Sequence, residues 1–172
     1  EAEDKLDLLI KSVPHVRQKP DFCGEACVEM ILAKKGHKFS QDQVFALSGV
    51  DPKLGRGMIS RDLAKTLKKL GFITGPGWYK VKSDGTAEIT AQWDAMIADL
   101  AKGVPSIVCM HYDDQARTTE HFRLILGYNK KTDKLIYHEP AERRGAYLKM
   151  SRTQFLKLWP LKYSEKAWTL IR

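Results

Sequence analysis

The spacing of apolar residues changes part-way along the chain, and this change most limits the possible folds. From Cys23 to Leu100 the apolar residues recur every three or four positions, which is typical of helices that cover a core. Short apolar runs rich in β-branched residues follow, at residues 104–110, 122–128, 135–138, 146–150 and 167–171. Helices followed by antiparallel strands predict an α+β domain.

Cap and stop signals set the expected helix boundaries. Ser40 with Gln43 three residues later predicts a capping box, and the Lys-Lys-Gly run ending at Gly36 predicts a helix end. Ser60 and Ser151 are expected to cap two further helices. The predicted helices cover residues 1–10, 23–35, 40–48, 60–70, 92–101 and 151–159, with a short strand at 78–81.

The length of 172 residues favours one domain over 1–172, with residues 1–11 as a lead-in segment. A hydrophobic content of 43% is enough for one core. No run of 18 apolar residues is present, so no membrane span is expected. The chain begins with Glu1 rather than Met, which favours a removed leader and a secreted or periplasmic protein, although a cloned fragment would look the same.

The net charge of +8 allows acidic partners, nucleic acid among them. The basic residues are scattered in separate pairs, however, which favours a solvated basic surface. We expect no nucleic-acid partner and a monomer. A nucleic-acid binder, the third alternative for function, would need its basic residues on one face.

The three cysteines are too few for a disulfide framework. Zinc binding is a weak alternative, because the spacing of Cys23 and Cys27 exceeds C-x-x-C and no second pair exists. Neither metal nor cofactor is expected. Cys27 and Cys109 are expected in the core, with a Cys23–Cys27 disulfide as the less favoured alternative.

Cys23 lies where turn residues give way to a helix. A thiol at a helix N-terminus feels the positive end of the helix dipole, which stabilises a thiolate. Gly24 leaves room for a substrate carbonyl, and the Cys23 N–H is free to point at an oxyanion. The Gln18 side-chain amide, five residues upstream, is the candidate second oxyanion donor.

His121 stands at the start of a predicted strand, and Glu139 at the end of the next strand. If the two strands pair about the loop 129–134, both side chains come to the open end of one hairpin. They are then candidates for a general base and its orienting acid. The other four histidines are expected at the surface or in loops, with His111 and His138 as candidate cleft residues.

The ordered set of Gln18, Cys23-Gly24, His121 at a strand start and an acid before Pro140 resembles the bacteriocin-processing double-glycine peptidases. It is most similar to their free-standing relatives, the C39-like peptidases, and the resemblance covers roughly residues 12–160. It includes the helix start at residues 40–44 and the loop at residues 49–55. The resemblance implies a papain-like fold, in which a helical half carrying Cys packs on an antiparallel sheet carrying His.

The resemblance also implies roles for single residues. Cys23 matches the nucleophile, His121 the general base and Gln18 the oxyanion-hole glutamine. Glu139 stands where the family usually carries Asp, and this longer side chain must retract to hold the imidazole. The implied activity is that of a cysteine peptidase or related thiol acyl hydrolase acting on a peptide or protein. The alternative is a non-catalytic peptide-binding module that keeps the papain-like groove, which the Glu139 departure favours.

Overall fold

The computed structural model describes residues 8–115, 120–163 and 165–172. Most of the helices precede most of the strands, as the change in apolar spacing predicted. The elements are β1 (Leu8–Leu9), α1 (Cys23–Lys34), α2 (Gln41–Ser48), the 3₁₀ helix η1 (Pro52–Leu54), α3 (Ser60–Lys69), β2 (Trp78–Lys82), α4 (Thr86–Ala101), β3 (Ser106–His111), β4 (Glu120–Asn129), β5 (Lys134–His138), β6 (Leu148–Ser151), α5 (Arg152–Leu158) and β7 (Ala167–Ile171).

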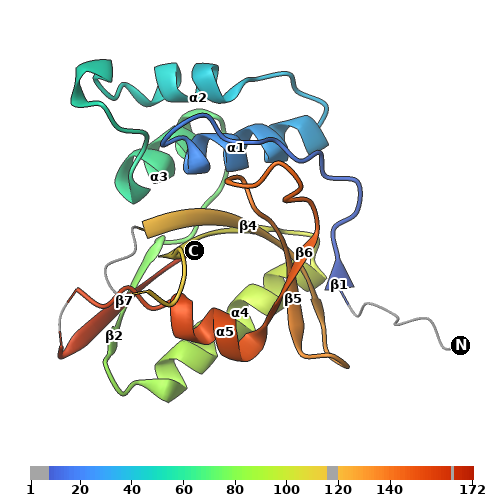
Figure 1. Cartoon of the computed structure of the whole chain (residues 1–172), viewed down its shortest axis with the longest axis vertical. Helices are drawn as coiled ribbons and strands as arrows, with labels where there is room; N and C mark the ends of the chain where they lie inside the picture. Colours follow the sequence, from blue (N-terminus) through green and yellow to red (C-terminus); the bar gives the residue numbers. More distant parts are fainter. Residues whose placement is uncertain (1–7, 116–119, 164) are drawn as a thin grey trace, which may run out of the picture.

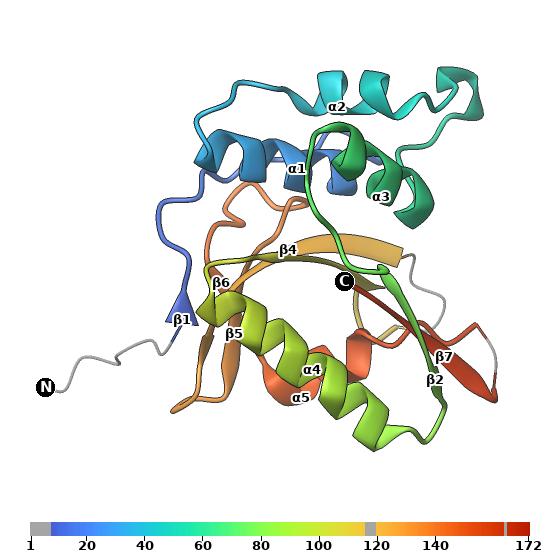
Figure 2. The same ribbon diagram turned by 180° about the vertical axis from the view of Figure 1, so that it is seen from behind.

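The strands form one antiparallel sheet in the order β2-β7-β3-β4-β5-β6, and β1 pairs with β4. Helices α1, α2 and α3 lie on one face of this sheet, and α4 and α5 lie on the other (Figures 1 and 2). The α+β prediction is therefore confirmed, including an N-terminal helical layer packed against an antiparallel sheet.

Strand β4 is buried on both faces, which explains its long apolar run. Phe122, Leu124 and Leu126 pack in the core beneath α1 to α3. Ile125 and Tyr128 pack in the core against α4 and α5. The side chains from Phe122 to Leu126 follow the two-residue period of a strand. The pairing register of β4 shifts between Ile125 and Gly127, and Tyr128 accordingly packs in the core opposite to that of Leu126.

The predicted helix starts were correct to different degrees. Ser40 accepts a hydrogen bond from Gln43 N, and Gln43 Oε1 accepts one from Ser40 N, so the capping box is confirmed. Helix α3 begins at Ser60 rather than after it, because the Asp62 carboxylate accepts from the N–H of the preceding Ile59. Helix α4 begins at Thr86, six residues before its predicted start. The prediction missed this start because the first turn is mostly exposed and lacks an apolar stripe.

The predicted lead-in helix is wrong where the structure describes it. Leu8 and Leu9 form a strand whose partners are Tyr128 and Gly127 of β4. Ile10 N continues this pairing by donating to the Leu126 carbonyl at 2.8 Å. Residues 1–7 lie outside the described part. Within the described ranges, no helix combines the length and apolar character needed to cross a bilayer.

Candidate active site

The turn before α1 brings Cys23 to the sheet. Phe22 N donates to the Lys19 carbonyl at 2.9 Å, and Asp21 has a φ of 64°, so the chain reverses immediately before the helix. At Gly24 an added Cβ would lie 3.1 Å from the Phe122 ring. The absence of a side chain at Gly24 therefore lets α1 approach β4 closely, whereas the sequence predicted room there for a substrate.

The Cys23 thiol lies against the start of β4. Its Sγ accepts a hydrogen bond from Phe122 N at 3.5 Å. Phe122 N is the nitrogen of the peptide bond that joins His121 to Phe122, so the thiol lies beside the backbone of His121. Burial raises the pKa of Cys23, and it outweighs the lowering by the N–H groups of Phe122, Gly24 and Cys23 itself. The helix start thus favours the thiolate as predicted, but burial has the larger effect.

The β4–β5 hairpin brings His121 and Glu139 together. Leu124 pairs with His138, so the residue after β5 comes opposite the start of β4. His121 Nε2 lies 2.5 Å from Glu139 Oε2, and both side chains are buried. Burial opposes ionisation of Glu139, but the hydrogen bond to His121 and the charge of Arg123 outweigh it and lower the pKa of Glu139. The ionised carboxylate requires a proton on Nε2, which leaves Nδ1 of a neutral imidazole as the acceptor.

Arg123 is a member of this cluster that the sequence reasoning missed. Its Nε donates to Glu139 Oε1 at 2.8 Å, and its side chain is buried. Tyr112, also missed, packs its ring edge-on to the His121 ring with centroids 5.2 Å apart. One signal for Arg123 was available, because a cation inside a strand buried on both faces needs a buried counter-charge.

Gln18 lies beside the same segment. Its backbone N donates to the Pro140 carbonyl at 2.8 Å, directly after Glu139. His15 Nε2 lies 2.7 Å from the Glu139 carbonyl oxygen, so the chain before α1 is held along residues 139–140. The side-chain Oε1 of Gln18 is buried without a hydrogen-bond partner. The structure therefore brings Gln18 to the Glu139 side of the site, with an unused acceptor oxygen; an oxyanion hole would use the Nε2 donor of the same amide.

His138 does not line a cleft, so that expectation is wrong. It is fully buried; its Nε2 lies 2.8 Å from the Val13 carbonyl oxygen, and its Nδ1 accepts from Tyr147 N at 3.0 Å. Both ring nitrogens are therefore occupied in holding the N-terminal segment to the sheet. His111 is half-buried, and its carbonyl accepts from Arg123 Nη1 at 3.2 Å.

Glu25 was also missed, although it lies only two residues after Cys23. Its side chain is fully buried; Oε2 accepts from Met58 N at 3.1 Å, while Oε1 has no partner. Burial is the largest cause that raises the pKa of Glu25 from 4.5 to about 7. At Gly57 an added Cβ would lie 2.7 Å from Glu25 Oε2, so this segment closes directly over the carboxyl.

The other two cysteines are core residues, as predicted. Cys27 and Cys109 are buried in the core beneath α1 to α3, and burial raises the pKa of both. All three cysteines are free thiols, so the structure contains no Cys23–Cys27 disulfide. Among the described residues, no group of three or more His, Cys, Asp and Glu side chains could hold a metal ion.

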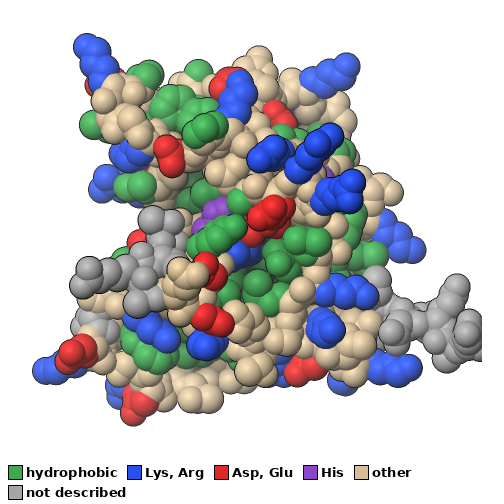
Figure 3. Space-filling view, in the orientation of Figure 1, with side chains coloured by type: hydrophobic (Ala, Val, Ile, Leu, Met, Phe, Trp, Pro, Cys, Tyr) green, Lys and Arg blue, Asp and Glu red, His purple; other side chains and the backbone are tan. Residues whose placement is uncertain are grey.

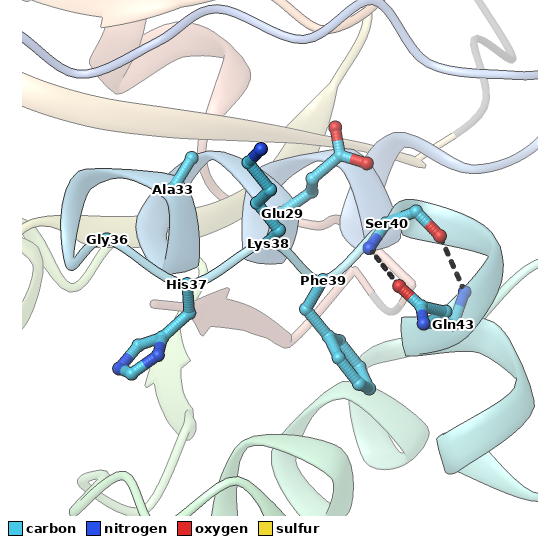
Figure 4. Close-up of a pocket in the computed structure, with 8 residues that line it drawn as sticks. All are labelled: Glu29, Ala33, Gly36, His37, Lys38, Phe39, Ser40 and Gln43. Carbon is cyan, nitrogen blue, oxygen red and sulfur yellow. Dashed lines mark hydrogen bonds between the residues drawn. The ribbon is translucent and has the colours of Figure 1, made fainter.

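The molecular surface has a recess between the helical layer and the sheet. Figure 3 shows a histidine side chain within it, bordered by hydrophobic and acidic side chains. A separate open hollow of about 510 Å³ lies at the C-terminal part of α1 and the start of α2. Figure 4 shows its lining, which includes His37 and Phe39 but none of the clustered site residues.

The fold is shared with solved peptidase domains. The chain is similar to the peptidase domain of Streptococcus ComA, described as a bi-functional ABC transporter in a quorum-sensing pathway, with 15% identity, a TM-score of 0.54 and coverage of 94% of this chain and 100% of that one. It is similar to a C39-like peptidase from Bacillus anthracis, with 12% identity, a TM-score of 0.64 and coverage of 96% and 97%. It is also similar to a double-glycine-motif protease from an AMS/PCAT transporter in complex with its leader peptide, with 16% identity, a TM-score of 0.51 and coverage of 92% and 90%.

The model of the Peptidase_C39 like family matches residues 10–166. No curated protein matches the sequence. Because the family match spans most of the chain, the protein belongs to the Peptidase_C39 like family, as the resemblance of the ordered motifs predicted. The papain-like fold implied by that resemblance is likewise confirmed by the solved peptidase domains.

Proposed function

We propose that this protein is a cysteine peptidase that cleaves peptide bonds through an acyl-enzyme on Cys23. The observation that carries the proposal is the buried His121–Glu139 contact at 2.5 Å, beside a thiol hydrogen-bonded to the residue after His121. A nucleophile, a base and a group that orients the base form the general arrangement for acyl transfer. Membership of a peptidase family supports the same reaction.

In the proposed reaction, His121 Nδ1 takes the Cys23 proton and the thiolate attacks the peptide carbonyl. The Cys23 N–H and the Gln18 amide stabilise the oxyanion. His121 then donates its proton to the leaving amine, and later takes a proton from the water that releases the acyl group. The raised pKa of Cys23 makes this transfer depend on the imidazole, because burial disfavours a solitary thiolate.

Glu139 keeps the imidazole in the required tautomer. The Glu139 carboxylate accepts the Nε2 proton, so the lone pair of Nδ1 stays available for Cys23. The longer Glu side chain reaches this distance in a buried position, which weakens the case for a binding module without catalysis. The peptide substrate class follows from the family and from the leader peptide held by one of the solved relatives.

The test is the pH dependence of iodoacetamide labelling, measured thiol by thiol through peptide mass mapping. We expect Cys23 to label rapidly below pH 7, and His121→Ala to abolish this rapid phase. Cys27 and Cys109 serve as internal controls, because both are buried and should label slowly at every pH. Labelling of Cys23 that rises only near or above the free-thiol pKa of about 8.5 would favour the peptide-binding alternative.

A positive result leads to substrate measurements on the same variants. Cys23→Ala should abolish cleavage of a peptide library. Gln18→Ala should reduce kcat by about 100- to 1,000-fold, as expected for the loss of one oxyanion donor, without a comparable loss of folding. Equal turnover by Gln18→Ala and the wild type would remove Gln18 from the proposed oxyanion hole.

A further inference from the structure

Arg123 occupies an unusual position for a cation. Its side chain leaves the interior of β4 and is 5% exposed. A guanidinium buried without partners would cost several kcal/mol, so its hydrogen bonds should account for its position. Nε donates to Glu139 Oε1 at 2.8 Å, Nη1 to the His111 carbonyl at 3.2 Å and Nη2 to the Tyr112 carbonyl at 2.8 Å. Every nitrogen of the guanidinium is therefore used.

These contacts divide the two oxygens of Glu139 between two residues of one strand face. Oε1 accepts from Arg123, while Oε2 contacts His121 and accepts from Ala141 N at 3.2 Å. Residues i and i+2 on a strand are about 7 Å apart, so a carboxylate between them can touch both. With Oε1 held by Arg123, rotation of the carboxylate is restricted and Oε2 faces the imidazole.

Arg123 also holds one wall of the site. Its Nη2 bond fixes the Tyr112 backbone, and the Tyr112 ring lies edge-on to the His121 ring. The guanidinium carbon is 5.5 Å from the centre of the same ring, which is a cation–π contact. One side chain therefore connects the orienting acid, the base and the aromatic residue that packs against the base.

We propose that Arg123 is a positioning residue that holds Glu139 in the conformation that orients His121. The inference rests on the proposed function and deepens it. Glu has one more side-chain torsion than Asp, so a Glu at position 139 loses more conformational freedom when it is held at the imidazole. The Arg123 contact fixes that extra torsion and supplies a reason why Glu can serve where the resemblance implies Asp.

The charged and titratable groups around Glu139 come from several elements. His121 and Arg123 come from β4, Tyr137 from β5 and Cys27 from α1, while Tyr112 follows β3 and Glu142 follows β5. His15, on the segment before α1, contacts the Glu139 carbonyl oxygen rather than the carboxylate, so His121 and Arg123 are the cationic groups that lower the pKa of Glu139. Loss of Arg123 should therefore make Glu139 easier to protonate and move the acid limb of the site's pH profile upward.

The experiment compares Arg123→Gln, Arg123→Lys, Glu139→Gln and the double variant Arg123→Gln/Glu139→Gln. The rate of Cys23 alkylation and kcat/KM are measured against pH. In Arg123→Gln we expect the midpoint of the acid limb to move to higher pH by roughly 1 unit. We expect kcat to fall by about 10- to 100-fold, part of the ~100- to 10,000-fold that acid–base catalysis supplies. KM should change little, and Arg123→Lys should restore the limb more fully than the rate.

The double variant separates positioning from general support of the fold. If Arg123 acts through Glu139, Arg123→Gln should have almost no further effect on the profile in the Glu139→Gln background. Arg172→Gln is the matched control, because Arg172 also forms an ion pair but with a different partner. Its Nη1 lies 2.7 Å from Asp99 Oδ2, and neither residue belongs to the Glu139 cluster. The control should lower thermal stability without moving the profile. The proposal would be overturned if the effects of the two single substitutions multiplied in the double variant. It would also be overturned if the pH profile of Arg123→Gln were identical to that of the wild type.

The position of the proton on the His121 ring can be measured even if no peptidase activity is found. The ¹⁵N shifts of the His121 ring report its tautomer directly. We expect a proton fixed on Nε2 in the wild type and a mixture in Arg123→Gln, or in Arg123→Lys if the Gln variant does not fold. Slow Cys23 labelling in the wild type would reject the proposed function alone. An unchanged tautomer in a folded Arg123 variant would reject the role of Arg123.

Discussion

Two buried carboxyl groups, one in each half of the molecule, lie in opposite electrostatic surroundings. Glu139 follows the sheet strand β5 and contacts Arg123 and His121. Glu25 lies in the first turn of α1 and accepts from Met58 N through Oε2, with Oε1 unpartnered among the described residues. The pKa of Glu139 is lowered, whereas burial raises that of Glu25 to about 7. Burial alone favours the neutral acid, and a buried cation with a hydrogen-bond donor reverses that preference.

The two halves of the molecule therefore hold carboxyl groups in different charge states, and each state suits a different role. The sheet half holds a charged carboxylate at a fixed place, as required for orienting an imidazole. The helical half holds a carboxyl that is mostly neutral below pH 7, near a thiol whose pKa the Glu25 charge would raise further. A permanent charge at Glu25 would oppose thiolate formation, so its neutral form suits the proposed nucleophile.

The largest effect is expected from Glu139→Gln. The amide cannot carry the charge that holds the His121 proton, so kcat should fall by about 100- to 10,000-fold. Arg123 would also lose its counter-charge in a buried position, which should cost about 3–5 kcal/mol of unfolding free energy. Cleavage assays and urea unfolding measure the two effects separately.

The contrast with Glu25 provides the control for that variant. Glu25→Gln replaces a mostly neutral acid by a neutral amide of the same shape, so it should leave kcat near pH 6 within a few-fold of the wild type. A Glu139→Gln enzyme that retained full activity, or a Glu25→Gln enzyme that lost it, would contradict the different roles inferred for the two carboxyl groups.

The second effect concerns stability and pH. Because the folded pKa of Glu25 exceeds its unfolded value, folding binds a proton between pH 4.5 and about 7. The stabilising contribution is complete below pH 4.5 and is lost as pH rises through about 7. The shift of about 2.5 units corresponds to about 3 kcal/mol. Glu139 has the opposite sign, because its folded pKa is lowered, and its contribution is lost as pH falls below its unfolded value.

Urea unfolding between about pH 2.5 and 8 checks both signs, because the Glu139 contribution is lost only below its unfolded pKa of 4.5. Wild-type stability should decline from pH 4.5 to pH 7.5, and Glu25→Gln should remove most of this decline. Glu139→Gln should leave the decline intact and instead weaken the loss of stability on the acid side. An identical slope in Glu25→Gln and the wild type would show that Glu25 ionises normally in the folded protein.

The parts of this site that the sequence predicted are those with local signals. The start of α1 at Cys23, the strand start at His121 and the hairpin that ends at Glu139 follow from turn residues and apolar spacing. Glu25 has no local signal of function, because it looks like an ordinary charged residue in its helix. The signal for Arg123, a cation inside an apolar strand, has meaning only once both faces of that strand are known to be covered. Their burial results from packing α1 against the segment at Gly57 and from covering both faces of β4, which are long-range events.

The same reasoning explains the errors in the fold. Residues 8–9 form a strand because β4 offers a free edge position there, and no periodicity within two residues can show this. His138 was expected at the surface or in the cleft, but the N-terminal segment covers it and uses both ring nitrogens. Pairings between distant segments therefore decided the features that local patterns did not predict.

The smallest effect tests whether nearby carboxylates contribute to the neutral state of Glu25. Asp21 is exposed and its charge is one of the causes that raise the pKa of Glu25, after burial and Asp62. Asp21→Asn should lower the Glu25 pKa by less than about 0.5 unit, because water and salt screen an exposed charge. Asn tolerates the φ of 64° at this position, so the turn should persist. A ¹³C titration of the Glu25 carboxyl measures the shift, which should shrink further in 1 M salt. A decrease of more than one unit would instead show that the Asp21 charge is a major cause of the raised pKa beside burial.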